Sequence, residues 1–429
     1  MFKHTIKKYG GLKALLLFIL IYISQDTLLF GTNSNQLFCS IGQYILIFAS
    51  FAMFVYMLIK RIGIPQKGFL LCIILIIMIW LTCVFNQELY TNYIYKTFLL
   101  ICAMLYTAIC SREKFIEYFT NIVFIISVFS IFIYLLFLIS PTLINYFPKM
   151  FNSAGAEYKF GFLSFAPLKV YTFNPRAMGI FREAGVYSIF LCIAIYFELF
   201  EKKTISIVKN IVYLIALITT FSTTGYIVLL LIVVCRISKK VGDKSKKRKI
   251  NYILFSLLFA SLIISQFTDL LSIDGDLFGK FFANSATYSS GTARISSIFT
   301  NLRMFWSNPL FGVGAYGVDT NFADLSWQFY SFNTVHNTNS FLMNYSSYGF
   351  IYGSTILILW YRFFAKNQGI MVGIELLVTF FLLLSGETLI HNVIFYIIAF
   401  YGLNNIEKTE FIPSVRRGSK ESVYGNRIN

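Results

Sequence analysis

The stretch Ile205–Lys249 reads ISIVKNIVYLIALITTFSTTGYIVLLLIVVCRISKKVGDKSKKRK. Its apolar part, Ile205–Ile237, is longer than the roughly 17–25 residues that one helix uses to cross a bilayer. Ser222-Thr223-Thr224-Gly225 interrupts it, so the stretch can hold two short spans. Cytoplasmic segments collect Lys and Arg, and a single span here would move the basic run KKVGDKSKKRK outside. Two spans keep this basic run on the cytoplasmic side with the other basic segments. The predicted topology therefore depends on whether Ile205–Ile237 holds one span or two.

The composition places the chain in a membrane. Its 429 residues are 57% hydrophobic and 13% charged, whereas a typical soluble domain is about a quarter charged. The net charge of +17 would suit nucleic acid, but its densest run, Lys239–Lys249, lies between two predicted spans. We expect this run to set orientation and meet anionic headgroups, with the lipid bilayer and no nucleic acid as partner. Seven cysteines without C-x-x-C spacing imply no disulfide framework or zinc site.

Further apolar runs are long enough to cross a bilayer. They are about Leu12–Phe30, Leu37–Ile59, Phe69–Phe85, Ile94–Cys110, Phe119–Ile139, Ala184–Phe200, Ile250–Phe267 and Asn339–Phe363. Ile370–Leu403 is ambiguous in the same way as Ile205–Ile237, because it can hold two spans broken near Ser385-Gly386-Glu387. Splitting both long stretches gives twelve spans, and leaving both whole gives ten.

The basic residues select twelve spans. With the N-terminus inside, 27 of the 36 Lys and Arg residues fall on the cytoplasmic side. The sequence therefore predicts an all-α polytopic membrane protein with about 12 transmembrane helices and both termini cytoplasmic. Residues 1–429 form a single integral membrane domain in this prediction. Its first apolar run is an uncleaved span, and a cytoplasmic tail covers about residues 404–429.

Two external loops are large in this topology, about residues 141–183 and 268–336. Loops of this length are usually functional or disordered. Both are rich in Phe, Tyr, Trp, Gly and Pro and poor in charge. We therefore expect packed structure on the membrane surface.

The first loop ends in FNPRAMGIFREAG, with Arg176, Arg182 and Glu183 where the chain returns to the bilayer. Arginine binds phosphate through a planar fork of donors and stays charged at any relevant pH. The alternative is that both arginines anchor the chain at the interface. Anchoring explains Glu183 less well, since a carboxylate at the hydrocarbon edge is costly.

The second loop carries Arg294, followed by a helical pattern that includes Arg303 and stops at Asn308-Pro309. Arg294 is predicted near the helix start, where backbone N–H groups favour anions. The glycines after Pro309 (Gly312, Gly314 and Gly317) predict a loop that can come close to a ligand.

His336 is the histidine in the external loops, and imidazole can take a proton from a sugar hydroxyl near neutral pH. The alternative is a solvated loop histidine beside Asn337 and Thr338, which could cap the next span. His391, Asp26 and Glu387 lie inside predicted spans and are interpreted as packing residues, with a minor claim to function. No metal cluster is visible in the sequence.

The motifs occur in a fixed order. They are Arg-x-x-Gly-x-Phe-x-Glu at Arg176–Glu183, Thr220-Phe221-Ser222-Thr223-Thr224-Gly225, Arg294 leading to Asn308-Pro309-Leu310-Phe311-Gly312-Val313-Gly314, and His336-Asn337-Thr338-Asn339-Ser340-Phe341 running into Tyr348-Gly349-Phe350. In order, spacing and sidedness the chain resembles the O-antigen polymerase/ligase family of polytopic membrane glycosyltransferases.

This resemblance implies a donor glycan on undecaprenyl pyrophosphate at the outer face of a bacterial cytoplasmic membrane. It also implies a flippase and a chain-length regulator of the same pathway as partners. Arg176 and Arg294 are then the expected pyrophosphate clamps, and His336 is the expected base for the acceptor hydroxyl. Pyrophosphate is a good leaving group and arginines can replace a metal in stabilising its charge. We expect a metal-independent glycosyltransferase without a cofactor.

Arg182, Glu183, Arg303 and Asn337 are expected to bind substrate around these three residues. Ligases of the family often carry an arginine where this chain has Thr223, which favours a polymerase of O-antigen or capsule repeat units over a ligase. A flippase of lipid-linked oligosaccharide is the alternative from another class. Transporters often show two related halves with broken helices, and no such repeat is visible in the sequence.

Overall fold

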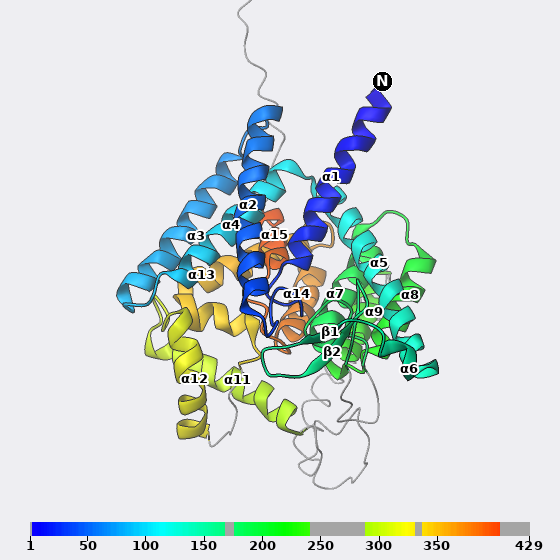
Figure 1. The fold of residues 1–429 in the computed structure, drawn as a ribbon. Helices are drawn as coiled ribbons and strands as arrows, with labels where there is room; N and C mark the ends of the chain where they lie inside the picture. Colours follow the sequence, from blue (N-terminus) through cyan, green and yellow to red (C-terminus); the bar gives the residue numbers. More distant parts are fainter. Residues whose placement is uncertain (1, 168–175, 241–287, 331–336, 404–429) are drawn as a thin grey trace, which may run out of the picture.

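The computed structural model describes residues 2–167, 176–240, 288–330 and 337–403, and these residues are mostly helical (Figure 1). The N-terminal part contains the helices α1 (Phe2–Tyr22), α2 (Gln36–Lys60), α3 (Gln66–Phe85), α4 (Thr91–Ile109), α5 (Arg112–Ile139) and α6 (Pro141–Ile144). The predicted span Ile250–Phe267 and the predicted tail lie outside the described residues. Elsewhere each predicted apolar run overlaps one or two helices.

Helix α1 ends at Tyr22, so the prediction of a span reaching Phe30 is wrong at this end. The hydroxyl of Thr27 donates to the backbone oxygen of Tyr22 at 2.9 Å, and it also lies 2.9 Å from the oxygen of Ser24. A hydroxyl that satisfies carbonyls left over at a helix end stabilises the end there. Asp26 therefore lies in the α1–α2 connection and not inside a helix.

The first long loop contains a three-stranded antiparallel sheet, which the all-α prediction did not include. Its strands are β1 (Lys149–Phe151), β2 (Glu157–Phe160) and β3 (Phe165–Pro167), in the order β1-β2-β3. An ion pair of 2.8 Å joins Lys149 to Glu157 across the first two strands.

The remaining helices follow this loop. They are α7 (Ala184–Tyr196), the π-helix η1 (Phe197–Glu201), α8 (Ile207–Thr219), α9 (Thr223–Lys240), α11 (Tyr288–Ser307), α12 (Ala315–Tyr330), α13 (Ser340–Ala365), α14 (Ile370–Leu384) and α15 (Val393–Tyr401). Ile205–Ile237 and Ile370–Leu403, each predicted to hold two spans, each contain two helices separated by a break. The first break falls at residues 220–222, slightly before its predicted position, and the second covers residues 385–392.

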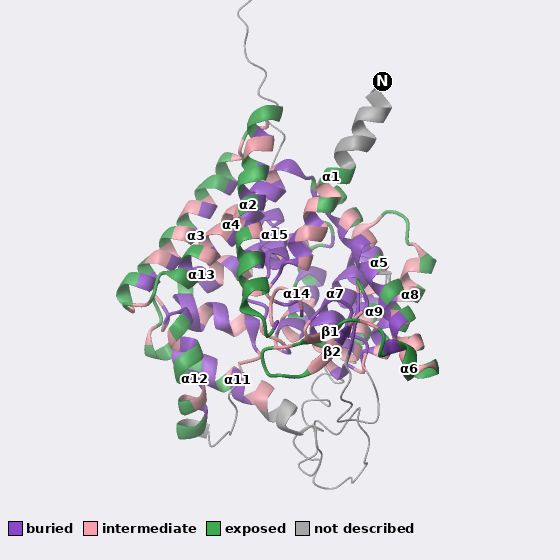
Figure 2. Ribbon diagram, viewed as in Figure 1, coloured by how far each residue is buried: buried purple, intermediate pink, exposed green. Residues whose placement is uncertain are grey.

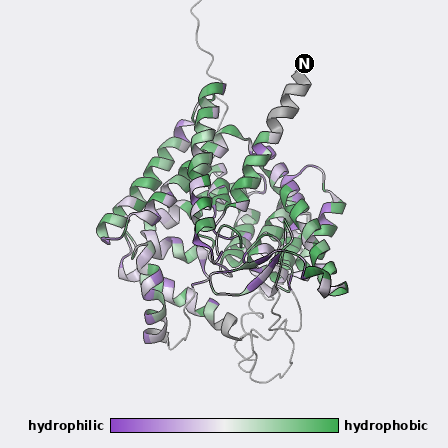
Figure 3. Cartoon of the chain, viewed as in Figure 1, coloured by the Kyte–Doolittle hydropathy of each residue, from purple (hydrophilic) through white to green (hydrophobic). Residues whose placement is uncertain are grey.

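Five described helices are long and apolar enough to cross a membrane: α2, α3, α4, α5, and α7 continued by η1 (Ala184–Glu201). Large apolar side chains stand outward on α2 and α3; Phe48 is 73% exposed and Leu70 is 60% exposed. Figures 2 and 3 show the consequence, an exposed and hydrophobic outer surface on these two helices. Such a surface suits hydrocarbon and not water, so the chain is a helical membrane protein.

The core lies around α15, where every residue from Val393 to Tyr401 is buried. This helix has nine residues, about 14 Å at 1.5 Å per residue. It is therefore too short to cross a hydrocarbon layer of about 30 Å. Helix α15 packs against α4, α13 and α1, and α14 packs against α13 and α9. The break between α14 and α15 is thus enclosed by helices distant in the sequence.

Candidate functional site

The end of the first loop is held against the α1–α2 connection. The N–H of Leu28 donates to the oxygen of Ile180 at 3.1 Å, and the N–H of Arg182 donates to the oxygen of Asp26 at 2.9 Å. Just before these bonds the chain turns at Gly179, whose φ of +56° favours glycine. The two segments therefore fix the backbone from which the Arg182 side chain extends.

Arg182 reaches the break between α14 and α15. Its Nη2 donates to the oxygen of Thr388 at 2.8 Å and lies 3.9 Å from Oδ1 of Asp26. Asn392 donates to the other oxygen of Asp26 at 2.6 Å. The Nε of Arg182 is buried and has no hydrogen-bond acceptor among the described residues. A buried donor without a partner is uncommon and calls for a ligand or an ordered water.

Burial and charge act against each other in this pair. Burial raises the pKa of Asp26 to about 6, although Arg182 and the hydrogen bond from Asn392 lower it. For Arg182, burial works against the charged form, but the carboxylates of Asp26, Glu387 and Glu183 outweigh it and the pKa is raised. The guanidinium is therefore held charged beside three carboxylates.

Arg294 meets the same region from the second loop. Its Nη1 donates to the hydroxyl of Thr224 at 2.7 Å, in the first turn of α9. Its Nη2 lies 3.8 Å from the place where a Cβ on Gly386 would stand. Burial lowers the pKa of Arg294, and the carboxylates of Glu387 and Glu183 oppose this shift.

Arg294 does not lie at a helix start, so that prediction is wrong. Helix α11 begins at Tyr288, which places Arg294 in its second turn. The unpaired N–H groups of a helix are those of its first four residues. At this position Arg294 can bind an anion through its guanidinium, but the free N–H groups of the helix N-terminus are not beside it.

Two carboxylates complete the set. Glu183 is exposed immediately before α7, and Glu387 lies in the α14–α15 break. A Cβ on Gly185 would stand 2.1 Å from Oε1 of Glu387, so this carboxylate lies directly on the first turn of α7. We call Asp26, Arg182, Glu183, Arg294 and Glu387 the arginine–carboxylate cluster.

Side chains from other helices hold the α14–α15 break in shape. The hydroxyl of Ser340 donates to the oxygen of Glu387 and accepts from the N–H of Leu389 at 2.6 Å. The ammonium of Lys96, buried in α4, donates to the oxygen of Ile390 at 2.6 Å. Asn392 caps α15 through the N–H of Ile394 at 3.0 Å. Non-helical backbone at membrane depth is tolerated where protein satisfies it in this way.

Asn337 ties the second loop to this break. Its side-chain amide pairs with that of Asn301 through two hydrogen bonds of 2.9 and 3.1 Å, and its backbone oxygen accepts from the hydroxyl of Thr388. The residue that caps α13 is Asn339, which accepts from the N–H of Leu342 at 2.9 Å. The alternative that Asn337 or Thr338 caps this helix is therefore wrong.

The glycine loop after Pro309 packs into a break of α13. Gly349 interrupts this helix with φ 80° and ψ −178°, and its Cβ would stand 2.0 Å from the oxygen of Leu310. The N–H of Val313 donates to the oxygen of Ser346 at 2.8 Å, and that of Phe350 donates to the oxygen of Pro309 at 2.7 Å. A Cβ on Gly312 would stand 2.5 Å from the oxygen of Ser346, so the close approach predicted for Gly312 is to protein backbone.

Glu88 occupies the other side of the glycine loop. Its carboxylate accepts from the N–H groups of Tyr316 and Gly317 at 3.1 and 2.6 Å, in the first turn of α12. A Cβ on Gly314 would stand 2.0 Å from that carboxylate. A carboxylate at a helix start is stabilising, and here it leaves no room for a ligand at Gly314.

Arg176 and Arg303 are not brought into the cluster. Arg176 borders a small recess with Tyr134 and Ala166, and its charge acts on Tyr226 in α9. Arg303 is exposed on α11, nine residues after Arg294, which is half a turn around the helix. His336 lies outside the described residues.

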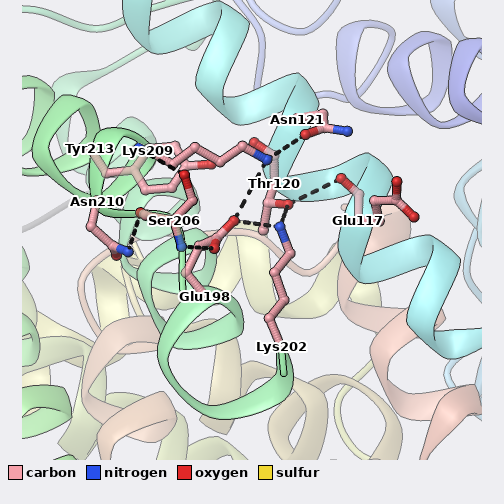
Figure 4. A network of polar contacts seen from close by, with 9 residues as sticks. All are labelled: Glu117, Thr120, Asn121, Glu198, Lys202, Ser206, Lys209, Asn210 and Tyr213. Carbon is pink, nitrogen blue, oxygen red and sulfur yellow. Dashed lines mark hydrogen bonds and ion pairs between the residues drawn. The ribbon is translucent and has the colours of Figure 1, made fainter. Parts of the chain in front are cut away.

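A second polar group lies at the far end of α7 and η1 (Figure 4). Glu198 in η1 is fully buried and forms an ion pair with Lys202, and Lys209 lies 3.7 Å from the same oxygen. Lys202 also donates to the hydroxyl of Thr120 at 2.8 Å, and Lys209 donates to Asn121. We call these five residues the lysine–glutamate network.

Neither a protein-family model nor a curated protein matches this sequence. The interpretation of the cluster therefore depends on its geometry and on the motifs.

Proposed function

We propose that the chain is a polytopic glycosyltransferase of the bacterial cytoplasmic membrane, of the repeat-unit polymerase type. It would transfer a glycan from undecaprenyl pyrophosphate to the non-reducing end of another lipid-linked repeat unit at the external face. One observation carries the proposal. Arg182 from the first long loop and Arg294 from the second converge on the same break, residues 385–392.

Two converging arginines suit a pyrophosphate leaving group. A new bond forms between the anomeric carbon of the donor glycan and the acceptor oxygen, while the bond from that carbon to phosphate breaks. The lipid pyrophosphate leaves with the electron pair, and guanidinium forks stabilise the charge that develops. The unpartnered Nε of Arg182 supports this role because a phosphate oxygen would satisfy it.

The proton of the acceptor hydroxyl must leave as the bond forms, and His336 is the proposed base. Arg176 is proposed as a further contact to the pyrophosphate, from the side of Tyr226.

The carboxylates of the cluster have a different proposed role. Asp26 faces Arg182 and Asn392, so it positions that arginine. Glu183 and Glu387 would repel a pyrophosphate placed against them. Ionised carboxylates accept hydrogen bonds from hydroxyl groups, so we assign these two residues to the sugar part of the substrate, with Asn337 and Arg303 in supporting positions.

The proposed topology has about twelve spans, both termini in the cytoplasm and the cluster outside. The distance between the two polar groups supports it. The arginine–carboxylate cluster meets α7 at its first turn, and the lysine–glutamate network meets η1 at its end. The 18 residues of Ala184–Glu201 between them span about 27 Å, close to the hydrocarbon thickness of about 30 Å.

Deletion of the gene in a cell that makes a surface polysaccharide tests the function. Loss of a polymerase leaves single repeat units attached to their acceptor, and the chain restored in trans returns the long polymer. Loss of a ligase instead leaves full-length polymer on the lipid carrier. If the deletion strain still carries long polymer on its normal acceptor, both the polymerase and the ligase assignments are contradicted.

A flippase of lipid-linked oligosaccharide is the second candidate, and one observation favours it. The chain is broken between α8 and α9 and between α14 and α15, and α14 packs against α9. Broken helices that meet at a polar site are common in transporters. Accumulation of repeat units on the inner leaflet after deletion would support this candidate over the polymerase.

A further inference from the structure

A cavity of about 580 Å³ lies between α2, α3 and α4. Aromatic and aliphatic side chains line it, among them Phe51, Phe54, Ile76, Phe98 and Met104. Ser50 also lines it, but its hydroxyl donates to the oxygen of Leu46 in its own helix at 2.9 Å. The wall is therefore apolar, and an apolar occupant fits it.

The cavity opens on the outer surface of the helix bundle. Of the residues that line it, Phe48 is 73% exposed and Phe51 is 63% exposed. All three helices are long and apolar enough to cross a bilayer, and α2 and α3 are largely hydrophobic in Figure 3. We therefore expect this surface to face lipid. A hydrocarbon chain can enter from the bilayer without passing through water.

One end of the cavity adjoins a basic connection. Ile64 lies in the α2–α3 connection and Phe69 in the first turn of α3, and both line the cavity. Arg61 lies in this connection, and Lys60 and Lys67 flank it at the end of α2 and the start of α3; we refer to these three as the basic side chains of the α2–α3 connection. All three basic residues are exposed. No Asp or Glu occurs between Asp26 and Glu88 in the sequence. Within the described part of the chain, no ion pair involves Arg61 or Lys67.

Arg61 has a backbone conformation that favours glycine. It ends α2 with φ 52° and ψ 39°, and its N–H closes on the oxygen of Leu58 at 3.2 Å. Helices commonly end with glycine in this conformation, and another residue there pays a steric penalty. A charged residue therefore occupies position 61 although glycine would be less strained there. Arg61 is also close in the sequence to Ile64, which lines one end of the apolar cavity.

We infer that this cavity holds an acyl chain of an anionic phospholipid whose phosphate is bound by the basic side chains of the α2–α3 connection. Depth and charge both fit this occupant. The α3 residues that line the cavity run from Phe69 to Ile76, about 10 Å along the helix. The upper part of an acyl chain has this length, and its headgroup then lies level with Arg61 and Lys67. The inference is independent of the proposed transferase activity.

Native mass spectrometry of the full chain in detergent tests the inference, with phosphatidylglycerol or phosphatidylethanolamine of identical acyl chains as the probes. The wild-type chain should retain one phosphatidylglycerol molecule in preference to phosphatidylethanolamine. The double variant Arg61→Gly/Lys67→Gln should weaken that preference about fivefold for each basic residue removed. Arg362→Gln/Lys366→Gln removes two exposed charges at the end of α13 and should leave it unchanged.

Filling the cavity is the second arm. Ile76→Trp should abolish retention of either lipid, whereas Ile77→Trp should not, because Ile77 is exposed on the same helix and does not line the cavity. Equal retention of the two lipids by the wild type would overturn the inference. So would undiminished retention by Ile76→Trp, or a stable dimer that excludes lipid from this face. If Ile76→Trp fails to fold, the charge variants decide.

Discussion

The arginine–carboxylate cluster and the lysine–glutamate network contain similar groups but are built differently. The network gathers Thr120, Asn121, Glu198, Lys202 and Lys209 from three neighbouring elements, and Lys202 follows Glu198 by four residues. Each lysine there has a carboxylate and a side-chain oxygen as acceptors (Figure 4). Such a closed set stabilises the meeting of α5, η1 and α8.

The cluster draws on segments far apart in the chain, and most of its charges lie on non-helical backbone. Asp26, Glu183 and Glu387 lie in connections, and Arg182 keeps a buried N–H without an acceptor among the described residues. Sites that bind ligands retain polar groups that the protein alone does not satisfy. This difference fits the proposal that the cluster binds a ligand, whereas the network stabilises the fold.

The largest effect should come from breaking the network. Glu198→Gln removes the buried carboxylate that faces Lys202 and Lys209 and should lower the free energy of unfolding by about 3 kcal/mol, because two partly buried lysines lose a charged partner. Thermal unfolding of the purified chain in detergent measures this. Glu117→Gln is the control, since its pair with Lys114 is exposed on both sides and should contribute at most about 1 kcal/mol. Equal losses in the two variants would contradict the structural role.

Arg294→Ala should reduce polymer formation about 100- to 1000-fold, while the protein still inserts normally, because a preorganised donor to the leaving group is lost. Arg294→Lys should also be poor, since lysine cannot present a planar fork. The length distribution of the surface glycan measures both variants. Lys209→Gln removes a charge from the network and should leave the glycan unchanged per folded molecule. Wild-type polymer from Arg294→Ala would remove the cluster from the mechanism.

Asp26→Asn should give about a tenfold loss of activity and a changed pH profile. The pKa of Asp26 is raised to about 6, so the wild type should lose activity as the pH falls through 6 and the carboxylate ceases to attract Arg182. The stability contribution has the opposite sign. The folded state holds this proton more tightly than the unfolded state, so stability falls as the pH rises from about 4 to 6.

Activity of the reconstituted protein, measured over a series of pH values, tests this prediction on Asp26→Asn and on the control variant Glu157→Gln. The Asp26→Asn profile should lack the limb near pH 6, and Glu157→Gln, in the sheet of the first loop, should keep it. An unchanged limb in Asp26→Asn would assign it to another group.

Arg303→Ala should have the smallest effect, less than about threefold in polymer formation, because Arg303 is exposed half a turn away from Arg294 on α11. The assay is the one used for Arg294→Ala. A loss as large as that of Arg294→Ala would restore Arg303 as a residue that binds substrate directly.

The helix pattern was predictable because it depends on local sequence. Apolar runs of the required length predicted α2 to α5 and α7, and polar residues within Ile205–Ile237 and Ile370–Leu403 predicted two breaks that the structure contains. The start of α11 was not predictable in the same way. Ser289, Ser290 and Gly291 are weak helix formers, yet the helix begins before them at Tyr288.

The cluster was only partly predictable. Arg182 and Glu183 were recognised as charged groups at the end of the first external loop, and Arg294 was recognised within the second. Asp26 and Glu387 carried a usable signal, since an ionisable residue in an apolar stretch is costly and often functional. Thr224, Thr388 and Asn392 carried none. They contact charged side chains that are distant in the sequence through a hydroxyl, a backbone oxygen and a side-chain amide, and these groups resemble those of any other polar residue.

The sequence by itself determined that this chain is a helical membrane protein and that Ile205–Ile237 and Ile370–Leu403 are broken, because hydrophobicity and chain length act locally. Only the tertiary structure decided that Arg182 and Arg294, more than a hundred residues apart, meet at the α14–α15 break. It also decided that the glycines after Pro309 pack against α13 and Glu88. These pairings depend on how α7, α9, α11 and α14 pack, and packing is a property of all these helices together.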